Sequence, residues 1–265
     1  MKNICLTTLL MAATIFVMSP LTANASSAAE LESAFKAINR AGLDVGSTIE
    51  VKNLVLEHQD LVLTLDSGRM AFLTPVTIGS ETKVIGAYWE GFGGFQFVPP
   101  NDMERGQLWR FFEAESLNHP LESILFYFSD DLHQKLAASG QKADSLFSDD
   151  QIDAVKEHRE EFQKNIRRPY MFGLLNALIT PSEKPFMLIN ANLEKIGRVF
   201  YEYDPHQRES VKLYKHYRRP GRNYMELAGS YWPNPDNNPY ANINGPSMDR
   251  IRVDHYDTDV TVDGA

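Results

Sequence analysis

The chain contains very little cysteine, one residue in 265, at Cys5. Disulfides therefore cannot stabilise it, and its stability must come from a packed core. Cations are also scarce relative to anions: 26 Lys and Arg stand against 35 Asp and Glu, for a formal net charge of −9. Because phosphate binding requires a cationic surface, this balance argues against nucleic acid as the main partner. Beyond the first residues, no apolar run approaches the ~20 residues of a membrane-spanning helix.

The start of the chain has the three parts of a cleavable export signal. Lys2 gives a basic beginning, an apolar run follows from Ile4 to Val17, and Ala23–Ala25 forms a small-x-small cleavage site. A run of this length is too short for a membrane-spanning helix and is typical of a secretory signal peptide. We predict that residues 1–25 are removed and that the mature chain is exported, periplasmic or extracellular, without a thiol.

The remaining residues, about 240, are enough for one large domain or two small ones. We expect a β-rich α+β module over residues 26–246, in which antiparallel meander sheets carry inserted helices. A sub-boundary near 140–148 is an open alternative to a single domain. Residues 247–265 are expected to form a strand that opens a further domain absent from this chain.

Hydrophobic periodicity divides the first half of this module into a helix and a meander. Apolar residues recur at helical spacing over Ser27–Gly42, and from Ser47 the period changes to two. Turns are expected at His58–Asp60, at Asp66–Gly68 and around Glu90-Gly91, because Asp, Ser and Gly favour turn backbones. The strands expected between them are Ile49–Leu56, Leu61–Leu65, Met70–Leu73, Val84–Trp89 and Phe92–Val98.

The second half alternates helices with strands. Asn101 is placed to cap a helix, with Glu104 three residues later as its capping-box partner. A charged helix is expected from Ser148 to about Ile166, and a shorter apolar segment runs from Tyr170 to Ile179. The strands expected here are Glu122–Phe128, Phe186–Asn190, Arg198–Tyr203, Val211–Tyr217 and, at the end, Ile251–Val262.

Short patterns of glycine, proline and aromatic residues follow one another along the module: Gly68–Val76, Gly86–Pro100, Glu104–Phe111 and Phe126–Asp131. In this order they resemble the region that precedes the peptidase part in secreted bacterial relatives of aminopeptidase N, the gluzincin metallopeptidases. Val253–Asp263 is similar to the strand that opens the aminopeptidase-like β-domain of that family. The likeness covers the chain from Ser47 to Asp263 and implies a β-rich module of the same style.

The chain departs from that family at the point where catalysis would begin. Such peptidases hold zinc with His-Glu-x-x-His and a downstream Glu. The nearest approach is His158–Glu161, which offers one His and no second ligand four residues on. The resemblance therefore implies a non-catalytic accessory module, a fragment or a truncated paralogue, with no cofactor and with a peptidase-like domain or an envelope component as its partner. A longer parent protein would be a metallopeptidase relative.

A basic run interleaved with tyrosines is the first candidate for a binding surface. Basic residues that alternate with aromatics can bind polyanions or an anionic membrane surface, so an envelope-surface module is one alternative function. The other interpretation is a strand and loop whose cations pair with the acidic remainder of the chain. The basic residues are Lys212, Lys215, Arg218, Arg219 and Arg222.

A dense group of aromatic residues is the second candidate. Tyr88, Trp89 and Phe92 lie close to Gly91, followed by further aromatics in the same pattern. Exposed aromatic patches often mark interaction sites, so these rings are candidates for a carbohydrate or peptide platform. Alternate aromatics in a strand are more often core.

Acidic and histidine residues give two weaker candidates. Asp254, Asp257 and Asp259 offer oxygen ligands to calcium, but their spacing is not that of an EF-hand, and a solvated strand face is favoured. A hydrolase whose groups meet only in the fold is an alternative to the binding module, although no Gly-x-Ser-x-Gly elbow is present. The residues to test for it are Glu104, Asp130, Asp131, His206 and His255.

Overall fold

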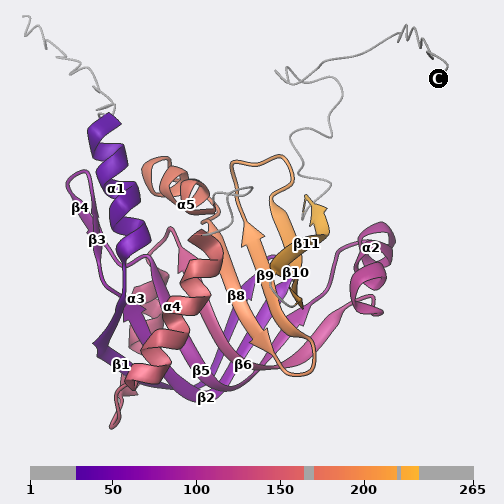
Figure 1. Ribbon diagram of the computed structural model, residues 1–265, viewed down its shortest axis with the longest axis horizontal. Helices are drawn as coiled ribbons and strands as arrows, with labels where there is room; N and C mark the ends of the chain where they lie inside the picture. The colour runs from indigo at the N-terminus through magenta and orange to yellow at the C-terminus, as the bar shows by residue number, and fades with distance from the viewer. Residues whose placement is uncertain (1–27, 164–169, 220–221, 233–265) are drawn as a thin grey trace, which may run out of the picture.

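The computed structural model describes residues 28–163, 170–219 and 222–232, and its architecture is α+β, dominated by one antiparallel sheet (Figure 1). The sheet has nine strands in the order β11-β10-β9-β8-β6-β5-β2-β1-β7, and β3 and β4 form a separate two-stranded sheet. The predicted fold class is confirmed. The helices are α1 (Ala28–Arg40), α2 (Asp102–Phe112), α3 (Leu132–Ser139), α4 (Asp149–Gln163) and α5 (Tyr170–Ile179). The strands are β1 (Leu43–His58), β2 (Leu61–Leu73), β3 (Val76–Ile78), β4 (Glu81–Lys83), β5 (Gly86–Phe97), β6 (Leu117–Phe128), β7 (Gln141–Lys142), β8 (Met187–Leu193), β9 (Gly197–Tyr203), β10 (Val211–Arg219) and β11 (Arg222–Tyr231).

The nine-stranded sheet is rolled, so that strands far apart in its order touch. His58 at the end of β1 lies 3.0 Å, Nδ1 to hydroxyl oxygen, from Tyr201 of β9. In a flat sheet the four strands between β1 and β9 would hold them roughly 24 Å apart, at ~4.8 Å per spacing. Tyr231 of β11 likewise donates its hydroxyl to Asp60 Oδ2, in the β1–β2 turn, at 3.0 Å. The tip of the β1–β2 hairpin therefore closes against β9 and β11.

The inner face of the roll holds the first of two apolar cores. Its side chains come from strands on both sides of the roll and meet in the middle, as where the rings of Phe97 and Tyr201 lie 6.1 Å apart between centroids. Trp89 is fully buried here. Leu108 of α2 and Leu136 of α3 pack against the same core from the chain's two inner helices. Each large apolar side chain removed from water contributes about 1.5–3 kcal/mol, so this interior is a principal source of stability.

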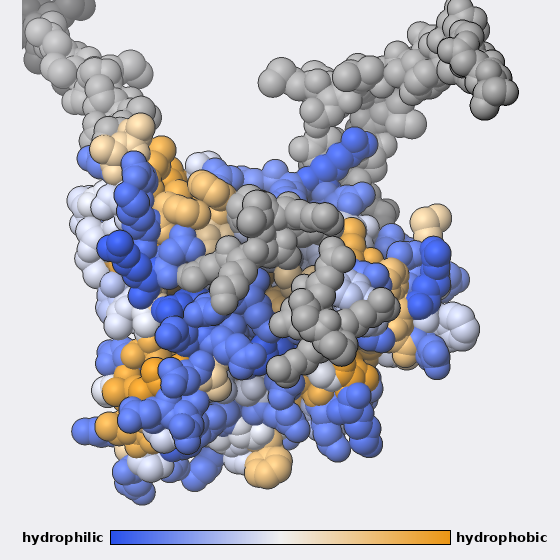
Figure 2. All heavy atoms as spheres, in the orientation of Figure 1, coloured by the Kyte–Doolittle hydropathy of each residue, from blue (hydrophilic) through white to orange (hydrophobic). Residues whose placement is uncertain are grey.

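The outer face of the sheet is covered by α1, α4 and α5 (Figure 1). On the surface of this side, hydrophilic side chains gather over the charge-rich helix α4 (Figure 2). Successive strand residues point to opposite faces, and the residues that alternate with the inner core, such as Tyr88, Tyr127 and Phe200, form the second core here. The helices supply side chains such as Ile38 of α1 and Leu174 of α5, both fully buried. The α5 sequence is apolar nearly throughout, which suits a helix largely enclosed by its neighbours.

Three neighbouring strands, β2, β5 and β6, each carry an irregularity in register. Bulges of this kind bend a strand and increase its twist, which favours a rolled sheet. The turns predicted at Asp66–Gly68 and around Glu90-Gly91 are wrong, because β2 and β5 run through these segments as continuous, bulged strands. The shifts fall between Leu65 and Ser67, between Glu90 and Gly93, and between Leu121 and Ser123.

Other predicted boundaries agree with the structure. The His58–Asp60 turn joins β1 to β2. Asn101 caps α2, and its Oδ1 accepts the backbone N–H of Glu104 at 3.0 Å. The apolar segment Tyr170–Ile179 is the helix α5. Other strands differ: β1 begins at Leu43 rather than Ile49, β6 begins at Leu117 rather than Glu122, and the sequence pattern does not predict β3, β4, β7 or β11.

The sheet takes strands from both sides of residues 140–148. β6, before this segment, pairs with β8, after it, and the short β7 inside it pairs with β1. No helix within the described ranges is long and apolar enough to cross a membrane. The predicted signal peptide, residues 1–25, and the predicted final strand in residues 247–265 lie outside the described residues.

Candidate ligand-binding pocket

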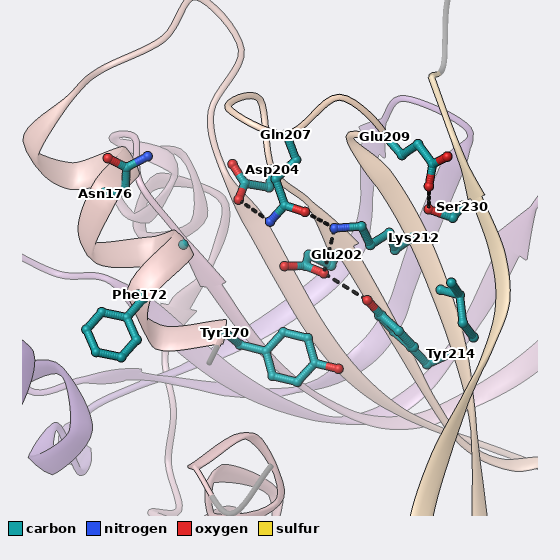
Figure 3. Close-up of a pocket in the computed structure, with 12 residues that line it drawn as sticks. Tyr170, Phe172, Asn176, Glu202, Asp204, Gln207, Glu209, Lys212, Tyr214 and Ser230 are labelled. Atoms are coloured by element: carbon teal, nitrogen blue, oxygen red, sulfur yellow. Dashed lines mark hydrogen bonds and ion pairs between the residues drawn. The ribbon is translucent and has the colours of Figure 1, made fainter. Parts of the chain in front are cut away.

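A polar pocket of about 560 Å³ lies on the outer face, between α5 and the strands β9, β10 and β11 (Figure 3). Its volume is in the range of small-molecule sites. The charged groups come from β9, β10 and the loop between them, and the first turns of α5 form the opposite wall. The lining residues used below are Tyr170, Glu202, Asp204, Glu209, Lys212 and Tyr214.

Two carboxylates on β9 and its end dominate the pocket. Glu202 and Asp204 are two residues apart, so both point to the outer face, and they are only 4% and 3% exposed. Asp204 accepts the backbone N–H of His206 at 2.9 Å on Oδ1 and the side-chain amide of Gln207 at 2.7 Å on Oδ2. Both of these donors are neutral, so neither brings a positive charge to the Asp204 carboxyl group.

Glu202 is held by residues from the neighbouring strand β10. Lys212 is its direct partner in the register of β9 and β10, and Lys212 Nζ lies 3.8 Å from Glu202 Oε2. Tyr214 donates its hydroxyl to the same oxygen at 3.1 Å. Lys212 also donates to the side-chain oxygen of Gln207, which links the Glu202 and Asp204 groups into one network. Figure 3 shows this chain of contacts across the pocket.

The wall opposite the strands depends on close packing of α5. A Cβ atom added at Gly173 would lie 3.2 Å from Asp204 Oδ2 and 3.0 Å from the ring of Phe186, so glycine lets the helix approach the carboxylate. Tyr170 of α5 and Tyr214 of β10 pack edge to face, with ring centroids 6.0 Å apart. The floor of the pocket thus combines carboxylate oxygens with the edges and faces of two tyrosine rings.

At the outer end of the pocket, Glu209 is exposed and accepts a hydrogen bond from Ser230 of β11. Among the described residues of the lining, Glu202, Asp204 and Glu209 carry carboxylates and Lys212 is the cation. The pocket is therefore an acidic, partly aromatic recess that can accept donors. None of the described lining residues is a histidine, and Ser230, a hydroxyl residue of the lining, already donates to a carboxylate.

A second recess, of about 490 Å³, is more open and lies over the bulges of β2 and β5. It contains a partly buried ion pair, in which Arg69 Nη2 lies 2.7 Å from Glu90 Oε1 and each side chain is about one quarter exposed. Arg69 also donates to the carbonyl of Leu146 at 3.0 Å and stacks over the ring of Phe147. Gln151 of α4 donates to Glu90 as well. These contacts hold the start of α4 against the sheet, so the ion pair has a structural role.

The structure separates the two described lysines of the predicted basic run. Lys212 faces outward into the pocket, where it meets Glu202. Lys215 points to the inner side, where its ammonium donates to the carbonyl of Phe111 at 2.7 Å and lies over the ring of Phe112. These two cations therefore do not form one surface. The side chains of Arg218, Arg219 and Arg222 are outside the described part of the structure.

The predicted aromatic group divides between core and surface. Tyr88 and Trp89 are 3% and 0% exposed, so neither offers a ring face to a ligand, and the core interpretation holds for both. Phe92, next to the glycine of the β5 bulge, is 79% exposed and borders the second recess. Of the three rings, Phe92 alone is available to a partner.

The residues named for a hydrolase are not gathered at either recess. Glu104 lies on α2, Asp131 precedes α3, and His206 lies in the β9–β10 loop, where its Nε2 is 2.9 Å from the carbonyl oxygen of Thr180. Asp130 accepts the backbone N–H of Leu132. His255 and the metal candidates Asp254, Asp257 and Asp259 are outside the described residues. Within the described ranges, no group of three His, Cys, Asp or Glu residues is placed to hold a metal ion.

Neither Glu202 nor Asp204 is among the site residues predicted from the sequence. A signal for them exists: Val199–Tyr203 is apolar and aromatic except for Glu202, and two acidic residues spaced by two at the end of such a strand are exceptional in a core. Their partners come from β10 and the β9–β10 loop. The facing walls of the pocket come from α5 and β11, and the sequence pattern does not predict β11. Comparisons of this chain with protein-family models, with curated proteins and with solved structures found no match.

Proposed function

We propose that this chain is an exported, non-catalytic binding module, and that the pocket between α5 and β9–β11 is where it takes its ligand. The observation that carries the proposal is this recess, in which Glu202 and Asp204 are nearly buried yet line about 560 Å³ of open space. Burying carboxylates is unfavourable unless they are hydrogen-bonded or paired, so a fold that keeps two of them at a cavity usually uses them.

The arrangement of the lining favours binding over catalysis. Nucleophilic catalysis requires a nucleophile within reach of a base, and the hydroxyls of Tyr214 and Ser230 are instead tied to carboxylates. The proposed export is supported by the basic, apolar and small-residue pattern of residues 1–25. The accessory role is supported by the resemblance to the region that precedes the peptidase part in aminopeptidase N relatives, and a peptidase-like domain or an envelope component is the proposed partner.

The proposal is tested by ligand-observed NMR on the purified mature chain, using a fragment library that includes neutral, anionic and cationic members. We expect hits that are lost in Ser230→Phe, because the larger side chain fills the recess beside Glu209. The matched control is Glu226→Phe, which places the same ring at an exposed position of β11 that does not line the pocket. Hits that survive Ser230→Phe, or no hits at all, would overturn the assignment of this pocket.

A separate measurement tests the non-catalytic part. The purified chain is incubated with aminoacyl anilides, with and without a chelator, and its zinc content is measured. We expect no release of the anilide and no stoichiometric zinc. Chelator-sensitive turnover with zinc near one per chain would contradict the proposal.

A further inference from the structure

We infer that the ligand of this pocket is a small organic ammonium ion, held by Asp204 and Glu202 and enclosed by Tyr170 and Tyr214. The inference rests on the proposed function, because it names the class of ligand for the same pocket. It follows from three observations: the sign of the lining charge, the neutral donors around Asp204, and the aromatic lining.

The charge of the lining favours a cation. Two carboxylates more than nine-tenths buried share the recess with a third, exposed one, and Lys212 is the one cation among the lining residues that the structure describes. Lys212 lies close to Glu202 and donates to Gln207. Among the described residues no ion pair joins Asp204 to a cation, and its carboxylate accepts hydrogen bonds from the backbone N–H of His206 and the side-chain amide of Gln207. A positively charged ligand would compensate this charge, whereas an anion would be repelled.

The remaining lining favours an organic cation over a bare metal ion. The rings of Tyr170 and Tyr214 and the side chain of Leu227 form an apolar part of the pocket next to the carboxylates. Tyrosine rings attract ammonium groups through their π-electrons, and the effect grows as water is excluded. A primary ammonium also offers three donors to the carboxylate and amide oxygens present. An amine with a small apolar group therefore matches both parts of the recess.

The test compares three probes of similar size that differ in charge: benzylammonium, benzyl alcohol and benzoate. Binding to the purified mature chain is measured by isothermal titration calorimetry at pH 7 and low salt. We expect benzylammonium to bind at least tenfold more tightly than benzyl alcohol, and benzoate to be weakest. Asp204→Asn should reduce the affinity for benzylammonium at least tenfold.

Because Asp204 is buried, its variant can lose the fold, and Glu209→Gln provides a second variant at an exposed position of the pocket rim. It should weaken benzylammonium binding about two- to fivefold at low salt, whereas Glu226→Gln, which removes the same charge outside the pocket, should not. Suppose that benzyl alcohol or benzoate binds as tightly as benzylammonium or more tightly, and that Ser230→Phe abolishes this binding. That result would overturn the inference and leave the proposed function standing. Binding of none of the three probes would overturn the inference, and a fragment library without hits would overturn the proposed function as well.

Discussion

Gly68 and Gly91 face each other where β2 and β5 are bulged, and their missing side chains let the two backbones approach closely. A Cβ atom at Gly91 would lie 2.1 Å from the carbonyl oxygen of Ser67, and one at Gly68 would lie 2.3 Å from that of Glu90. No real Cβ contact is so short, so either substitution forces the strands apart. These glycines look in sequence like the ends of turns, but they serve close packing within a sheet.

We therefore predict that Gly91→Ala lowers the free energy of unfolding by at least about 2 kcal/mol, since the backbone must shift to relieve the overlap. Gly106→Ala is the matched control. Gly106 is exposed in the middle of α2 with no atom within 4 Å of the new Cβ, so the change should stabilise by about 0.5–1 kcal/mol through helix propensity. Urea denaturation of both variants measures the effect, and equal shifts would contradict the assignment of the close approach.

For single residues, the sequence identified the aromatic cluster but did not predict which of its side chains are buried. Tyr88, Trp89 and Phe92 form one group in the sequence because all three are aromatic and adjacent to Gly91, yet two are buried and one is exposed. Alternation alone cannot tell which face of a strand is enclosed when helices cover one face and the roll encloses the other. Both faces of β5 are buried at Tyr88 and Trp89, so the period-two pattern carries no information there.

Among the elements, α2 shows how far a local sequence signal reaches. Asn101, with an extended backbone, accepts the N–H of Glu104, as the cap pattern predicted. A signal of this kind depends on three or four consecutive residues, so the rest of the fold does not change the local structure that it predicts. The turn predictions at Asp66–Gly68 and Glu90-Gly91 were wrong, because the long pairing of β2 with β5 outweighs the turn preference of Asp, Ser and Gly.

Removing the α2 cap should be measurable. We predict that Asn101→Ala lowers stability by about 1 kcal/mol, since the N–H of Glu104 loses its acceptor. Asn101→Asp keeps an acceptor at the positive end of the helix and should be close to neutral or slightly stabilising. Urea denaturation compares the two variants with the wild type. A loss of equal size in both would show that the cap does not stabilise α2.

For the whole molecule, two buried histidines make stability depend on pH. Burial lowers the pKa of His58 to about 4, and burial together with the nearby Arg198 lowers that of His158 to about 3. The usual value is near 6.5, so between pH 6.5 and 4 the unfolded chain binds these protons and the folded chain does not. Stability is therefore complete above pH 6.5 and falls as the pH is lowered.

We predict that the free energy of unfolding drops by roughly 3–4 kcal/mol between pH 7 and pH 5, as each histidine contributes up to about 1.4 kcal/mol per pH unit below its unfolded pKa. Chemical denaturation across this range measures it. The double variant His58→Gln, His158→Gln cannot bind these protons and should show a much flatter profile. If the stability of the wild type does not change from pH 7 to pH 5, the lowered pKa values assigned to the two buried histidines are wrong.

The overall class, α+β with meander strands, was predictable because it depends on periodicity summed over many residues. The roll and the pocket were not. The roll requires contacts between residues as far apart as Asp60 and Tyr231, and the pocket joins α5 to three strands, one of which gives no clear pattern. Such contacts are decided by how the bulged strands curve, and no short stretch of sequence encodes that curvature.

The closure of the hairpin tip by Tyr201 and Tyr231 also determines the order in which the chain can fold. The contacts from His58 to Tyr201 and from Asp60 to Tyr231 span 143 and 171 residues. A chain made from its N-terminus completes the β1–β2 hairpin early, but the partners of its tip are synthesised more than a hundred residues later. Contacts of this span make folding slow, because the loop must close before they stabilise anything. Until β11 is complete, the aromatic interior of the roll stays open on one side, which is when the nascent chain depends most on protection from aggregation.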